Sequence, residues 1–129
     1  MLPNPLIGPG VNAGLGFCKG DILPELNIQL VKAQYKATFD ELRGHLEGWS
    51  VRFEDGIQGP GRVVTIGGDQ YEFYSSCKPH DCGAKSLRVL TSIGGAAAWA
   101  MSLDSDRGTI RFYGKLDPAK QAVLLGNPY

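Results

Sequence analysis

The sequence predicts an α+β fold, in which an antiparallel five-stranded meander sheet is flanked by an N-terminal and a C-terminal helix. Five segments rich in β-branched and aromatic residues follow one another, each bounded by turn residues. One helical pattern precedes them and another follows. No connection between the five segments is long enough for the helix that joins two parallel strands, so consecutive strands are expected to pair antiparallel.

The first helix is expected to carry an apolar stripe formed by Tyr35, Phe39, Leu42 and Leu46. Charged residues lie between them and would face solvent, and Gly48 is expected to end this helix. The last helix is expected to begin with Asp117 as its N-cap and Pro118 at its first position. It would extend to about Leu125.

The strands are expected at residues 62–66, 70–75, 86–92, 97–103 and 109–113. Apolar residues alternate within them, for example at Trp99, Met101 and Leu103, as in strands with one buried face. Glycine pairs at 67–68 and 94–95 lie where tight hairpin turns are needed.

Length and charge limit the function classes. The 129 residues suit one domain, expected at 25–129, preceded by an irregular segment at 1–24 rich in glycine and proline. With 13 basic and 13 acidic side chains there is no basic excess, so nucleic-acid binding is not expected. Apolar stretches are too short for a membrane span, and residues 1–17 lack the basic start and unbroken apolar run of a secretory signal.

The segment from Ser75 to Gly83 holds the densest group of reactive side chains, and Cys77 and Cys82 can close a small ring there. A zinc site would use these two cysteines with His80, but one tight loop lacks the second ligand pair of such sites, and no metal is expected. A redox dithiol normally has two intervening residues ahead of a helix, not four between strands. A cysteine nucleophile would lack a third orienting group. No catalytic residue and no cofactor are therefore expected.

Two acidic stretches have ordinary explanations. Asp104 to Gly108 resembles the start of a calcium loop, but Lys115 occupies the twelfth position, where calcium requires a glutamate, so a hairpin turn is expected. Glu54 and Asp55 are expected to be solvated carboxylates rather than an acid–base pair.

The run Ser76-Cys77-Lys78-Pro79-His80-Asp81-Cys82-Gly83 closely resembles the loop of the Ivy family, the inhibitors of vertebrate lysozyme made by Gram-negative bacteria. The segment 35–39 (Tyr-Lys-Ala-Thr-Phe) is similar to the helix that opens that family's fold. The resemblance covers roughly residues 27–129. It implies an antiparallel sheet flanked by helices, a Cys77–Cys82 disulfide, residence in the periplasm and no enzymatic activity.

The resemblance further implies a function for the loop. His80 would enter the cleft of a c-type lysozyme, Lys78 and Asp81 would support it, and Pro79 would stiffen the tip. An alternative is a paralogue that acts on the bacterium's own lytic transglycosylases and so controls peptidoglycan turnover. Some members of the family pair, and the sequence leaves a homodimer open.

Overall fold

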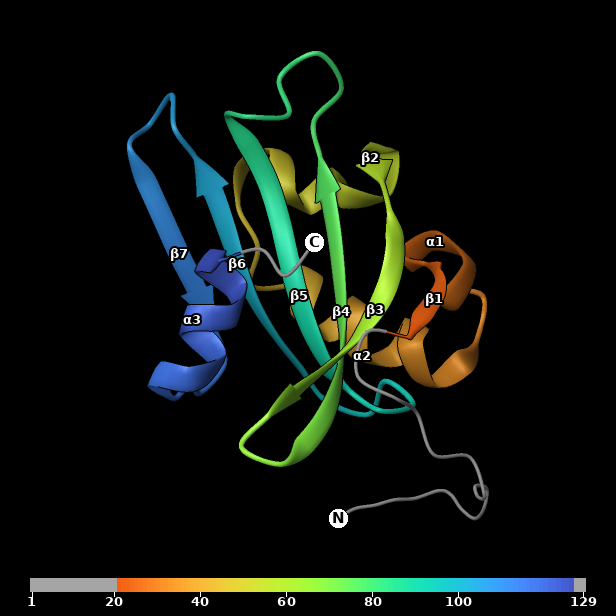
Figure 1. Ribbon diagram of the computed structural model, residues 1–129. Coiled ribbons are helices and arrows are strands. Elements are labelled where there is room, and N and C mark those ends of the chain that lie inside the picture. The colour runs from red at the N-terminus through yellow and green to blue at the C-terminus, as the bar shows by residue number, and fades with distance from the viewer. Residues whose placement is uncertain (1–20, 127–129) are drawn as a thin grey trace.

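A seven-stranded antiparallel sheet forms the centre of the computed structural model, which describes residues 21–126 (Figure 1). Its order is β1-β3-β4-β5-β6-β7, and β2 pairs with β4 beyond the end of β3. The strands are β1 (Ile22–Glu25), β2 (Ile57–Gln58), β3 (Pro60–Ile66), β4 (Asp69–Cys77), β5 (Lys85–Ser92), β6 (Ala98–Asp104) and β7 (Thr109–Tyr113). The expected α+β class and the meander from β3 to β7 are confirmed.

The expected count of five strands was too low, because β1 and β2 lie at the sheet margin. β1 occupies the end of the segment that we expected to be irregular, and its residues are mostly exposed. β2 has only two residues. Neither strand is long enough or buried enough to produce an alternating pattern, so pairing with β3 and β4, not local sequence, determines them. Residues 1–20 of the expected irregular segment, with Cys18, lie outside the described residues.

The helices are α1 (Leu26–Gln29), α2 (Ala33–Arg43) and α3 (Pro118–Gly126), together with the 3-10 helix η1 (Gly48–Asp55). The expectation that Gly48 ends the first helix was wrong, since α2 stops at Arg43 and Gly44 caps it. Leu46 nevertheless packs into the core from the turn that follows, which is why it continued the helical spacing. The N-cap of α3 is confirmed, because Asp117 Oδ1 accepts the Lys120 N–H at 2.8 Å.

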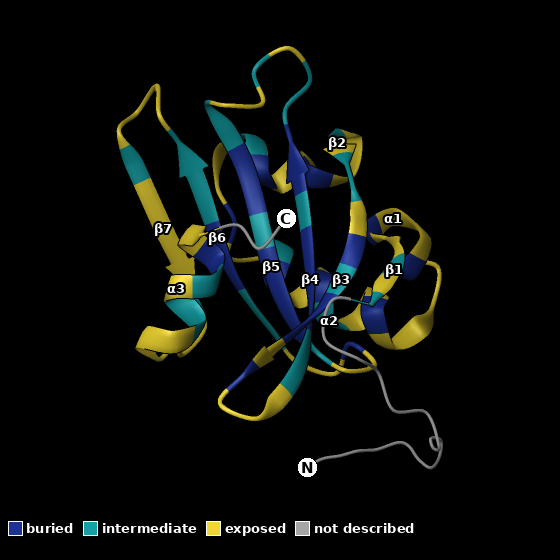
Figure 2. Cartoon of the chain, viewed as in Figure 1, coloured by how far each residue is buried: buried dark blue, intermediate teal, exposed yellow. Residues whose placement is uncertain are grey.

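Helices cover both faces of the sheet, so the central strands β4 and β5 are buried on both sides (Figure 2). One face packs against α1, α2 and η1 around Phe39, Phe53 and Tyr74. The other packs against α3 around Phe73 and Leu124. This double burial obscures the alternation expected of a sheet with one face in water. No helix within residues 21–126 has the length and apolar character needed to cross a membrane.

A buried carboxylate joins the first helices to the sheet. Glu72, only 3% exposed, accepts hydrogen bonds from the hydroxyls of Tyr35, at 2.8 and 2.9 Å, and of Tyr74. The Gly94 N–H also donates to it, at 2.9 Å. Because a buried charge needs several such donors, this network fixes α2 on β4.

Candidate functional site

The loop between β4 and β5 projects beyond the sheet at one end of the molecule (Figure 1). A disulfide joins Cys77, the last residue of β4, to Cys82. The pairing continues one residue beyond β4, because the Lys78 N–H donates to the carbonyl of Lys85, the first residue of β5, at 2.9 Å. The loop therefore has a covalent closure and a hydrogen-bonded closure at its base.

The tip of the loop is a tight turn with His80 at its third position. The Asp81 N–H donates to the Lys78 carbonyl at 3.0 Å, and Pro79 and His80 lie between them. Among residues 21–126, His80 is the only non-glycine residue with a positive φ, of 66°. Proline at the second position and positive φ at the third are typical of a type II turn, where glycine or asparagine is preferred third. The imidazole is exposed, while Lys78, Pro79 and Asp81 are half-buried.

The far side of the loop is held by Asp81 and Lys85. The Asp81 carbonyl accepts the N–H groups of Ala84 and Lys85, both at 3.0 Å. Lys85 Nζ lies 2.7 Å from an Asp106 carboxylate oxygen and 3.6 Å from one of Asp81. The hydrogen bond to Asp106 raises the pKa of the Lys85 ammonium, and the same bond lowers the pKa of Asp106. The charged pair thus links the loop to the next hairpin.

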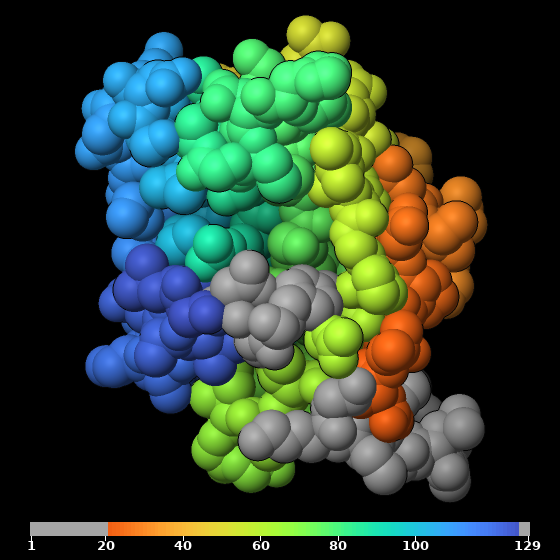
Figure 3. Space-filling view, turned by 45° about the horizontal axis from the view of Figure 1, so that its top comes forward, coloured from red at the N-terminus to blue at the C-terminus, as the bar shows by residue number. Residues whose placement is uncertain are grey.

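That next hairpin turn, residues 105–108 between β6 and β7, lies beside the loop. The Ser105 N–H donates to the Ala84 carbonyl at 2.8 Å. On the other flank β2 runs along β4, with Ile57 opposite Cys77. Figure 3 shows the loop in green between the blue hairpin and the yellow-green β2 segment. The loop therefore stands in the middle of a broader surface at this end of the molecule.

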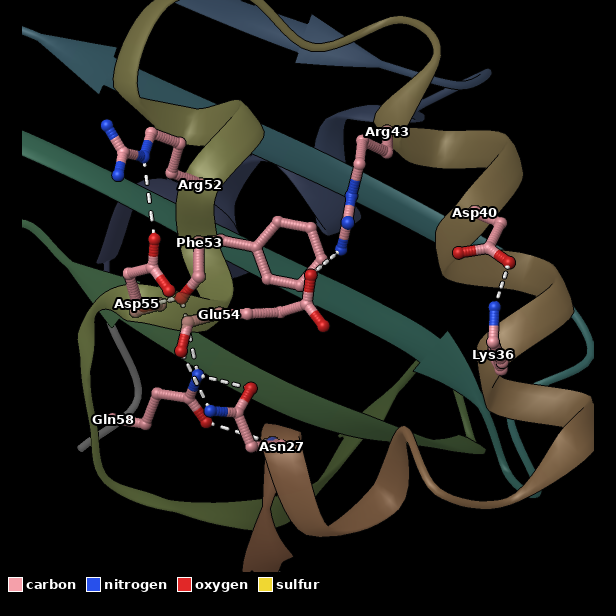
Figure 4. A network of polar contacts seen from close by, with 10 residues as sticks. Asn27, Lys36, Asp40, Arg43, Arg52, Phe53, Glu54, Asp55 and Gln58 are labelled. Carbon is pink, nitrogen blue, oxygen red and sulfur yellow. Dashed lines mark hydrogen bonds and ion pairs between the residues drawn. The ribbon is translucent and has the colours of Figure 1, made fainter.

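The other residues considered from the sequence lie away from the tip of the loop or form ion pairs with basic neighbours. Glu54 is ion-paired with Arg43, and Asp55 lies 3.4 Å from Arg52 (Figure 4). The second histidine, His45, is exposed on the turn after α2. Within residues 21–126 no cluster of three or more His, Cys, Asp or Glu side chains could hold a metal ion, and both loop sulfurs are bonded to each other.

The structure brings together the four predicted loop residues, Lys78 to Asp81, on one turn. Sequence reasoning missed Lys85, Asp106 and Ile57, which border the loop. The loop between β4 and β5 and the turn between β6 and β7 were both expected as hairpin connections. An antiparallel meander places alternate turns at the same end of a sheet. That rule would have placed residues 105–108 beside the loop. No pattern in the sequence around Ile57 indicates that this residue lies there as well.

The chain matches one family of known proteins. A family model described as "Inhibitor of vertebrate lysozyme (Ivy)" matches residues 35–124. The chain is 39% identical over 59 residues to the "Inhibitor of vertebrate lysozyme" of Escherichia coli (strain K12), and the aligned part covers 44% of this chain. A protein of the same name from Escherichia coli O157:H7 is equally similar. The chain spans 36% of the length of these relatives. Since the family model extends over more than half of the chain, from α2 through the Cys77–Cys82 loop to α3, the chain belongs to the Ivy family.

Proposed function

We propose that this protein inhibits a c-type lysozyme by inserting the Cys77–Cys82 loop, with His80 at its tip, into the enzyme's cleft. One observation supports the proposal most strongly. An exposed imidazole is held at the tip of a projecting, cross-linked turn, in a left-handed backbone conformation that is uncommon outside glycine. Strained backbone in a well-supported position is typical of residues with a functional role.

The chemistry of the target favours an imidazole at this place. Glycosidases of this kind use two carboxyl groups that flank the scissile bond, one of them a general acid with a raised pKa. The two ring nitrogens of His80 can hydrogen-bond to both carboxyl groups, and a protonated ring would do so with charge assistance. The inserted loop would occupy the substrate's place, so inhibition would be competitive and would require no cofactor and no catalysis.

Preorganisation of the loop supports tight binding. The disulfide, the Lys78–Lys85 hydrogen bond and the Asp81 carbonyl contacts restrict the loop before any partner binds, so little backbone entropy would be lost on association. Pro79 restricts the turn further, and Lys78 and Asp81 would support the imidazole from either side. A stable disulfide also fits an oxidising compartment, and we expect the protein to act in the periplasm or outside the cell.

The test is inhibition of a purified vertebrate c-type lysozyme by wild-type protein, His80→Ala and His45→Ala. A hydrogen bond to a charged group contributes about 1.5–3 kcal/mol, so loss of the imidazole should weaken inhibition by roughly ten-fold or more. His45→Ala is the matched control, because it removes an exposed histidine far from the loop in sequence, and it should inhibit like wild type. Equal inhibition by His80→Ala would refute the mechanism.

The same three proteins should be tested on a bacterial lytic transglycosylase. Inhibition of this enzyme alone, lost in His80→Ala, would assign the loop to control of the cell's own peptidoglycan turnover. Failure to inhibit lysozyme would reject the proposed function, whether or not the transglycosylase is inhibited.

A further inference from the structure

A solvent-exposed isoleucine lies directly beside the loop. Ile57 is 58% exposed, although it sits in β2 opposite Cys77. Its carbonyl oxygen is 3.8 Å from Cys77 Sγ. The backbone of Ile57 therefore lies against the base of the loop, and the residue is largely open to solvent.

The backbone that carries Ile57 is fixed on both sides. Before it, Gly56 packs so closely against β4 that a Cβ there would lie 2.1 Å from Ser76 Oγ and 2.8 Å from the Trp49 ring. After it, the Gln58 amide is paired with Asn27 through hydrogen bonds of 3.0 and 2.9 Å (Figure 4). An apolar side chain on so rigid a support loses little entropy when a partner covers it.

The fold itself does not require an apolar residue at position 57. The side chain contributes little to the core, and an exposed edge position is normally protected from unwanted pairing by a polar or charged residue. The opposite flank of the loop follows that rule, with Asp106 and Arg107 exposed on the hairpin turn. The exposed residue opposite Cys77 on the β2 side of the loop is thus apolar, whereas the β6–β7 turn on the other side carries exposed charges.

We propose that Ile57 forms a second contact, packing on the apolar lip of the same glycosidase cleft that receives His80. This inference rests on the proposed function. Clefts that bind small ligands are lined mainly by apolar and aromatic side chains, with a few polar groups inside. When the loop inserts far enough for His80 to reach the enzyme's carboxyl groups, a residue beside the base of the loop would lie against the rim of the cleft. Ile57 is the exposed apolar residue at the base of the loop, so it can pack against apolar side chains of the rim and exclude water there.

The experiment compares Ile57→Ser with Ile110→Ser in binding to a purified vertebrate c-type lysozyme. Ile110 is the matched control, since it is 52% exposed and lies on the far edge strand β7. Ile57→Ser should raise Kd about ten-fold, in line with burial of most of one aliphatic side chain. Ile110→Ser should stay within about two-fold of wild type. Unchanged circular dichroism and Tm would show that both variants are folded.

Salt dependence separates an apolar contact from an electrostatic one. Exposed charge interactions weaken with ionic strength, whereas apolar burial does not. The ratio of the two Kd values, Ile57→Ser to wild type, should therefore be the same at low and high salt. A ratio that collapses at high salt would overturn the apolar contact.

The outcomes separate the two proposals. If His80→Ala loses binding and Ile57→Ser binds like wild type, the proposed function stands and the second contact is refuted. Equal weakening by Ile57→Ser and Ile110→Ser would also refute it. If wild type does not bind or inhibit lysozyme, the proposed function fails and the second contact fails with it.

Discussion

The backbone N–H of Asp81 donates to the carbonyl oxygen of Lys78 at 3.0 Å and closes the turn that presents His80. The third residue of this turn, His80, has a positive φ of 66°, as in a type II turn. A glycine would adopt that conformation without steric cost, so the histidine is present at the expense of stability. The same residue should therefore affect stability and binding in opposite directions.

Replacing His80 by glycine or by alanine separates these effects. His80→Gly should be more stable than His80→Ala by about 1 kcal/mol, because only glycine accepts the left-handed conformation freely. Both variants should lose inhibition, since both lack the imidazole. Denaturant unfolding and a lysozyme assay on the same samples measure the two quantities. If the alanine variant were the more stable, the turn would not hold position 80 at positive φ in solution.

Removal of the disulfide tests whether the loop must be preorganised. The bond closes a ring of six residues, and the loop-entropy relation gives a contribution of about 2 kcal/mol. A Cys77→Ala, Cys82→Ala double variant should thus lose about that much unfolding free energy and keep its sheet, as seen by circular dichroism. Its inhibition should weaken by about ten-fold or more, because the loop must then be ordered on binding. Full inhibition by the folded double variant would show that the cross-link is dispensable for binding.

Sequence patterns predicted those parts of the fold that depend on interactions between residues close together in the chain. The meander from β3 to β7 follows from strand segments separated by short turns, and Asp117 acts at the N-terminus of α3 as its side chain suggested. The loop residues were found because one continuous run contains them. Each of these features depends on residues close together in the sequence.

The missed features depend on contacts between distant segments. Ile57 belongs to a strand only because Cys77, twenty residues later, pairs with it. Lys85 and Asp106 meet through the register of β5 and β6, which no single segment encodes. Glu72 occupies a strand position where a carboxylate suggests exposure, and its burial is made tolerable by donors from α2, from β4 and from the turn after β5.

Lys85 is expected to hold the loop in place through its two carboxylate partners. Lys85→Met keeps the length of the side chain and removes its charge, so Asp81 loses the ammonium 3.6 Å away and the link to Asp106 is broken. The Asp81 amide should then exchange with solvent faster, and inhibition should weaken several-fold. Lys115→Met, at an exposed position between β7 and α3, is the control.

The Lys85–Asp106 link should also respond to acid. The folded pKa of Asp106 lies below its ordinary value, so the link is complete at neutral pH and is lost as pH falls through that lowered value. Amide exchange of Asp81 in wild type should thus approach that of Lys85→Met only under strongly acidic conditions. Convergence at pH 6 would contradict this account.

The buried carboxylate network predicts how stability depends on alkaline pH. Burial, and then the charge of Glu72, raises the pKa of both Tyr35 and Tyr74 above the ordinary value. Unfolded tyrosine ionises near pH 10, so above that pH the unfolded state binds fewer protons than the folded state. The free energy of unfolding must therefore fall as pH rises, by up to about 1.4 kcal/mol per pH unit for each tyrosine.

Tyr74→Phe isolates one tyrosine from the other groups that titrate in this range. At pH 8 the variant should be less stable than wild type, since Glu72 loses a donor while it stays buried. Between pH 10 and 11.5 wild-type stability should fall more steeply than that of the variant, because only wild type must keep the Tyr74 proton in order to fold. The difference between the two proteins, measured by denaturant unfolding at each pH, should therefore narrow. Parallel pH profiles would mean that the hydroxyl of Tyr74 ionises as readily in the folded protein as in the unfolded chain, which its burial against a carboxylate does not allow.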